Sequence, residues 1–137
     1  MENYSLLTGV LNFALYFGIS IVFLVIFKTL YTLATPHAEW ELIKEQQNTA
    51  AATGFGGAIV GFAIALAGAV SNSTDLIDFA IWGVIALLAQ ILAFSIVRFI
   101  FMPKITARIE SNEVSAGIVL GATNIAVGCI NAACMTY

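Results

Sequence analysis

The sequence predicts an all-α, polytopic membrane protein with four transmembrane helices, on three observations. The chain has 137 residues, of which 61% are hydrophobic and only 9% are charged, against roughly 45–50% and 25% in soluble domains. A soluble domain of this length exposes too much surface to hide so many apolar side chains. The apolar residues also fall in four continuous runs, without the alternation typical of membrane β-barrels.

The four runs predict spans at residues 8–33, 50–70, 76–102 and 114–135, within a single membrane domain of residues 1–137. Each run has about the 20 residues that a helix needs to cross a bilayer. None contains proline, so each span satisfies its own backbone hydrogen bonds in lipid.

The first span is rich in large apolar residues, and so is the third. Their phenylalanines suit contact with lipid, and we expect these two spans on the outside of the bundle. The residues concerned are Phe13, Phe17, Phe23, Phe27, Phe94, Phe99 and Phe101.

The connection at residues 35–48 predicts a short interfacial helix or an extension of the second span. Thr35 and Pro36 suit an N-cap and a first helical position. The acidic residues that follow form a solvated face or, alternatively, a docking surface for a basic cytoplasmic partner. The candidate contact residues are His37, Glu39, Trp40, Lys44 and Asn48.

Small residues recur every three or four positions in the second and fourth spans, so they share one helix face. In lipid, such residues let helices approach closely and thereby drive association. We expect these spans to pack face to face inside the bundle, and the glycine stripes to join copies into a homo-oligomer. The packing glycines are Gly54, Gly57 and Gly61 in the second span and Gly117, Gly121 and Gly128 in the fourth.

The connection before the third span ends in Asp75, which suits a helix start, with Asp78 in the first turn. A ring of carboxylates at a channel mouth is the alternative interpretation of this pair.

A few amides lie inside the spans. We expect Gln90 and Asn12 each to bond an adjacent helix. Asn124 and Asn131 lie seven residues apart on one face, so they predict either interhelical hydrogen bonds or the polar lining of a narrow path. No charged residue lies in the middle of a span, which disfavours proton relays and strongly coupled pumps.

All five basic residues fall on one side of the predicted membrane domain: Lys28, Lys44, Arg98, Lys104 and Arg108. Loops enriched in basic residues stay in the cytoplasm, so both termini are predicted to be periplasmic.

The two halves of the chain, residues 8–70 and 76–135, predict an internal repeat. Residues 48–52 align with residues 113–117, each at the start of a glycine-rich span. Both halves enter from the same side, so a pseudo-twofold axis along the membrane normal would relate them.

Three stretches resemble the YjfL-like bacterial inner-membrane proteins, a family of small four-span proteins. They are residues 35–44 (Thr-Pro-His-x-Glu-Trp-x-Leu-Ile-Lys), residues 48–51 (Asn-Thr-Ala-Ala) and residues 131–137 (Asn-Ala-Ala-Cys-Met-Thr-Tyr). In the family an Asn-x-Ala-Ala element occurs in both halves, and here Glu113 departs from it. The resemblance implies the inner membrane of a Gram-negative bacterium and a genomic association with membrane-stress proteins, without an established activity.

The sequence therefore predicts a non-enzymatic, oligomeric component of a membrane-stress or envelope system, in contact with lipid and a peripheral protein partner. We expect no catalytic residue, cofactor or metal site. With net charge −3, we expect no nucleic acid partner. The alternative is a small oligomeric channel or transporter whose polar path is lined by the fourth span.

Overall fold

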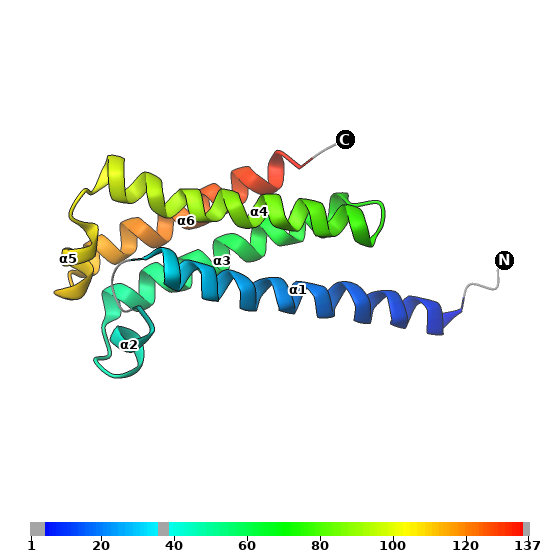
Figure 1. The fold of residues 1–137 in the computed structure, drawn as a ribbon, viewed down its shortest axis with the longest axis horizontal. Helices are drawn as coiled ribbons and strands as arrows, with labels where there is room; N and C mark the ends of the chain where they lie inside the picture. The colour runs from blue at the N-terminus through cyan, green and yellow to red at the C-terminus, as the bar shows by residue number, and fades with distance from the viewer. Residues whose placement is uncertain (1–4, 36–38, 136–137) are drawn as a thin grey trace.

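The computed structural model is built from helices (Figure 1). It describes residues 5–35 and 39–135, and this part of the chain contains no strand, which confirms the all-α fold. The elements are α1 (Leu6–Ala34), α2 (Glu39–Lys44), α3 (Thr49–Asn72), α4 (Leu76–Ile96), the π-helical turn η1 (Val97–Phe101), α5 (Ile105–Glu110) and α6 (Val114–Ala133).

Four segments are long and apolar enough to cross a membrane: α1, α3, α4 with η1, and α6. Their ends differ from those of the predicted spans by at most two residues. The third segment ends at Phe101, with the non-helical Met102 as its C-cap, because Pro103 follows and proline disfavours helical backbone in the residue before it.

The short helices α2 and α5 lie at one end of the bundle (Figure 1). The start of α1, the α3–α4 connection and the end of α6 lie at the other end. All five basic residues lie toward the α2 and α5 end, as the sequence predicted: four in α2, η1, α5 or the N-cap of α5, and Lys28 of α1 beside Trp40.

The most extensive helix contact joins α3 and α6, which run parallel to each other. At its centre, a Cβ atom on Gly57 would come closer than 3.0 Å to the backbone of Gly121. Gly61 and Gly117 are equally close to backbone carbonyls of the facing helix. No side chain larger than hydrogen fits at these points, so the glycines allow direct backbone contact.

The other three predicted glycines complete this contact. Gly128 faces the carbonyl of Gly61, Gly121 faces the carbonyl of Thr53, and Gly54 faces the side chain of Leu120. Because one chain covers both glycine faces, they are not available to a second copy. The expectation that these stripes join copies is therefore wrong.

Aromatic rings form a second core, which joins α1 to α3 and α4. Phe27 stacks on Phe62 with ring centroids 4.6 Å apart, and Tyr31 contacts Phe55 and Phe94 at 5.8 and 5.9 Å. Such ring pairs add stabilisation beyond the area they bury.

The expectation that all the phenylalanines of these spans face lipid is wrong for Phe23, Phe27 and Phe94, which are buried. Phe23 lies over Gly83, where a Cβ atom would come closer than 3.0 Å to the ring. Both helices are apolar on every side, so the sequence does not mark which face packs. The other four are exposed, as expected: Phe13, Phe17, Phe99 and Phe101.

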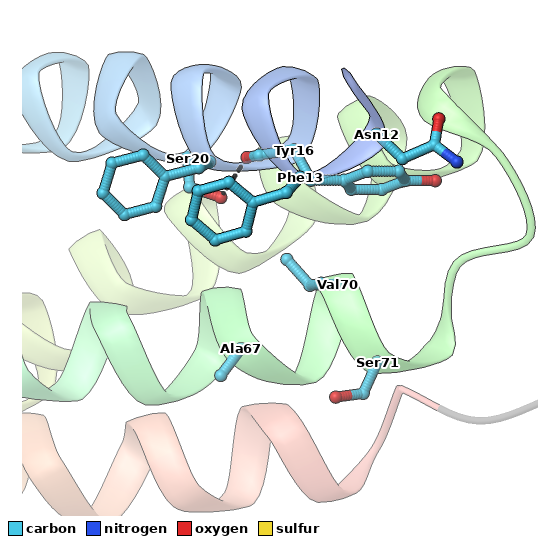
Figure 2. Close-up of a pocket in the computed structure, with 8 residues that line it drawn as sticks. Asn12, Phe13, Tyr16, Ser20, Ala67, Val70 and Ser71 are labelled. Carbon is cyan, nitrogen blue, oxygen red and sulfur yellow. Dashed lines mark hydrogen bonds between the residues drawn. The ribbon is translucent and has the colours of Figure 1, made fainter. Parts of the chain in front are cut away.

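α6 is less enclosed than the sequence predicted. α1 packs on α3 and α4, and α6 packs on the same two helices. In the close-up of Figure 2, α3 lies between α1 and α6. The face of α6 opposite the glycines is exposed, including Ile118 and Ile130. The prediction of a shielded interior helix is correct for α3 and wrong for α6.

The helix caps between α1 and α3 correct the prediction that Thr35 begins a helix. Thr35 ends α1, with its N–H donating to the Tyr31 carbonyl at 3.0 Å, so it is not the N-cap of a following helix. α2 is a separate short helix, because Gln47 takes a positive φ of 52° before α3. Asp75 caps α4 by accepting from the Asp78 N–H at 2.8 Å, as predicted.

Gln47 and Asn112 occupy corresponding places in the two halves. Each has a positive φ, 52° and 61°, and each directly precedes the N-cap of a glycine-rich span, Asn48 or Glu113. These turns agree with the predicted repeat, which stays a prediction.

The α3–α6 contact predicts opposite effects for two adjacent glycines. Gly57→Ala should destabilise the protein by about 1–3 kcal/mol, because its Cβ atom overlaps the Gly121 backbone. Gly56→Ala is the matched control, since nothing lies within 4 Å of its Cβ position. It should be neutral or stabilising by up to about 1 kcal/mol. Unfolding in mild detergent measures both, and equal stabilities would contradict the packing.

Candidate functional site

Three amide side chains gather between α4 and α6 in the middle of the bundle. Gln90 Nε2 donates to the Asn124 carbonyl at 3.1 Å. Asn131 Nδ2 donates to the Ala86 carbonyl at 3.1 Å and lies 3.4 Å from Gln90 Oε1. All three residues are buried. Gln90 thus makes the interhelical bond expected of it, and the cluster ties α4 to α6.

The Asn124 side chain differs from the other two. It is 0% exposed, and neither its Oδ1 nor its Nδ2 has a hydrogen-bond partner among the described residues. An unpaired amide in an apolar interior is costly, and buried polar groups of this kind usually bond protein or ordered water. This amide is therefore the strongest indication of a polar function inside the membrane.

A second candidate site is the platform at the α2 end of the bundle, which we define by Lys28, Trp40, Glu41 and Lys44. Lys28 Nζ lies 4.8 Å from the centre of the Trp40 ring, and Lys44 Nζ lies 6.0 Å from it. The ring also packs on Phe55 at 5.7 Å while remaining 42% exposed. Cations over an indole face stabilise its orientation.

Buried contacts hold this platform in place. The side chain of Leu42, in α2, is buried, and its carbonyl accepts a hydrogen bond from the Asn48 N–H at 2.9 Å. Glu41, Lys44 and Glu45 are exposed. The platform therefore presents charged groups and one aromatic ring on a fixed backbone.

Asn48 does not belong to the exposed surface, which corrects the prediction that it contacts a partner. It is 4% exposed and caps α3, because its Oδ1 accepts from the Ala51 N–H at 2.7 Å. Its Nδ2 donates to the Ile109 carbonyl at the end of α5, at 2.8 Å. Asn48 thus connects the two halves of the chain.

Asn112 reinforces the same connection, and sequence reasoning missed it. Its Oδ1 accepts from the Ala50 N–H at 3.0 Å, so it caps α3 from the other half. The signal was available, since Asn tolerates a positive φ and commonly bonds nearby backbone. Glu113 pairs with Arg108 instead of taking the role of Asn48.

Two predicted partner residues receive no structural test. His37 lies outside the described residues, and the side chain of Glu39 is likewise outside them. Asn12 is expected to bond an adjacent helix, but it is exposed on α1 and makes no hydrogen bond to another helix among the described residues. Within residues 5–35 and 39–135, no group of three His, Cys, Asp or Glu residues could hold a metal ion.

Comparison with known proteins decides the family. A family model described as "Domain of Unknown Function (DUF350)" matches residues 5–135. The chain belongs to the DUF350 family. It is 40% identical over 132 residues to the "UPF0719 inner membrane protein YjfL" of Escherichia coli (strain K12), which covers 96% of this chain and 98% of that protein.

A second relative is more distant. The "UPF0719 transmembrane protein YshE" of Bacillus subtilis (strain 168) is 29% identical over 107 residues, 77% of this chain and 79% of that protein. No solved structure matches. The resemblance seen in the sequence is confirmed, and this DUF350 member is a multi-pass protein of the inner membrane.

The amide cluster predicts coupling between Gln90 and Asn131. Gln90→Met and Asn131→Leu should each destabilise the protein in detergent, because each removes an interhelical hydrogen bond. In a double-mutant cycle the two should couple by about 0.6 kcal/mol, the average for such bonds in a membrane protein. Gln90→Met paired with Gly56→Ala is the control, and this distant pair should be additive. If the effects of Gln90→Met and Asn131→Leu are additive, the two side chains do not share a stabilising hydrogen bond.

Proposed function

We propose that this DUF350 protein is a non-enzymatic inner-membrane component that recruits a basic peripheral protein of a membrane-stress or envelope system. The α2 platform is the observation that carries the proposal. It presents the exposed Trp40 and the Glu41 carboxylate, with the exposed Glu45 next to it and Lys28 and Lys44 beside the ring, on a backbone fixed by buried contacts. Interfaces are enriched in tryptophan, and complementary charge steers encounter.

The orientation of the chain supports this role. Every basic residue belongs to the platform end, and basic residues are retained on the cytoplasmic side. We therefore propose that α2 and α5 face the cytoplasm and that both termini are periplasmic. A peripheral cytoplasmic protein would then reach Trp40 and Glu41 directly.

Homo-oligomerisation stays within the proposal, through a different surface. The glycine faces are covered inside one chain, so copies must meet through exposed apolar side chains. The outer face of α6 is suitable because it carries exposed apolar side chains, including Ile118, Ile125 and Ile130.

The recruitment proposal predicts that charge reversal on α2 disrupts partner binding. Glu41→Lys should abolish crosslinking of a peripheral protein to the platform and reproduce the envelope phenotype of a deletion strain. Glu110→Lys is the matched control, because it makes the same charge change on exposed α5 at the same end. It should leave both readouts unchanged. A crosslinking experiment that recovers no partner, with a normal phenotype for Glu41→Lys, would count against recruitment.

A small oligomeric channel is the second candidate, and the unpaired Asn124 amide favours it. In this alternative the amide would meet permeating water or ions along α6, with Asn131 further along the same face. Asn124→Leu should then abolish ion flux in proteoliposomes, while Ala126→Leu on the exposed face of the same helix should not. Flux that is absent from the wild type, or unchanged by Asn124→Leu, would exclude the channel.

A further inference from the structure

A groove runs between the first half of α1 and the second half of α3, at the end of the bundle away from α2. Figure 2 shows Phe13 and Tyr16 of α1 facing Ala67 and Val70 of α3 across it. Its central part has a volume of about 510 Å³. It continues toward the middle of the bundle as far as Leu24, over a further 220 Å³ or so.

The packing of α1 creates this groove. The second half of α1 is held by its buried aromatic residues. In the first half, Tyr16 packs on Phe79 of α4 with ring centroids 5.4 Å apart, whereas Phe13 and Phe17 stay exposed. Phe13 and Phe17 stack on each other at 5.3 Å, and the facing α3 positions Ala63 and Ala67 are small and exposed. Large rings opposite small residues leave space, and in hydrocarbon such space is filled by apolar groups.

The outer mouth of the groove has a different chemistry. Asn12 and Tyr16 line both the central part and the mouth, where Thr74 and Asp75 join them. Asp75 is exposed, and its Oδ1 accepts from the Asp78 N–H. All five basic residues lie toward the other end of the bundle: Lys28 of α1 lies beside Trp40, and the other four belong to α2, η1, α5 or the N-cap of α5. The mouth thus offers hydroxyl and amide groups and negative charge.

We propose that this groove binds one phospholipid with an ammonium headgroup, of the phosphatidylethanolamine class. An acyl chain would lie between the rings of α1 and the small residues of α3. The ammonium group would meet the Asp75 carboxylate, and the phosphate would accept hydrogen bonds from Asn12 Nδ2 and the Tyr16 hydroxyl. An anionic headgroup is disfavoured, because it would bring its negative charge to Asp75 without a cation to offset it.

This site is independent of the recruitment platform, which lies at the other end of the bundle. A helix from a second copy could also fill the apolar part of the groove, but it would not need a carboxylate at the mouth. The charge at Asp75 therefore separates the two occupants.

Lipid selectivity tests the proposal. The full-length protein is reconstituted in nanodiscs containing equal phosphatidylethanolamine and phosphatidylglycerol, and retained lipid is measured by native mass spectrometry. The wild type should retain one phosphatidylethanolamine in preference to phosphatidylglycerol. Asp75→Asn should reduce that preference about two- to fivefold, the range of an exposed ion pair. Asparagine still caps a helix, so the variant should fold.

Asp78→Asn is the matched control, because it removes the same charge from the same turn at a position that does not line the groove. Its selectivity should stay that of the wild type. Equal reduction by both variants, or equal retention of the two lipids by the wild type, would overturn the proposal.

Blocking the groove gives a second measurement. Ala67→Leu fills its centre and should lower the amount of retained lipid, whereas Ala126→Leu on exposed α6 should not. A wild type that carries no lipid would overturn the proposal. So would a dimer that Ala67→Leu converts to monomer, since a second copy would then be the occupant.

Discussion

The backbone contact between α3 and α6 is the constraint on which the rest of the fold depends. Gly57 and Gly121 bring the two helices so close that neither position accepts a Cβ atom. In a bilayer the surrounding lipid is as apolar as the side chains, so close dispersion contacts replace the hydrophobic effect as the main attraction. The same approach places the Asn124 carbonyl where Gln90 of α4 can donate to it.

The start of this helix pair is held by polar groups rather than by apolar packing. Asn48 and Asn112 cap α3 from two different halves of the chain, and Asn48 also satisfies a carbonyl at the end of α5. These bonds fix the relative height of α3 and α6, which the glycine faces need in order to meet. The exposed platform beside them is therefore part of a rigid end of the molecule.

The glycine contact and the aromatic core leave different parts of the helices exposed. Glycine packing covers one face of α6 and leaves the opposite face open. Aromatic packing buries rings in the second half of α1 but leaves Phe13 and Phe17 of the first half exposed. These two rings stand over small residues of α3 and line the groove.

The sequence by itself determined the four spans, the glycine positions on a common face, the start of α4 and the end at which the cations lie. These follow from run length, spacing and local capping, which act over a few residues. Only the tertiary structure decided that Phe23, Phe27 and Phe94 are buried, that Asn48 is a cap and that α6 is open on one side. It also decided that the Asn124 side chain has no hydrogen-bond partner among the described residues. The physical reason is that an apolar helix in lipid carries no polar face to show which side packs, so partner helices make that choice.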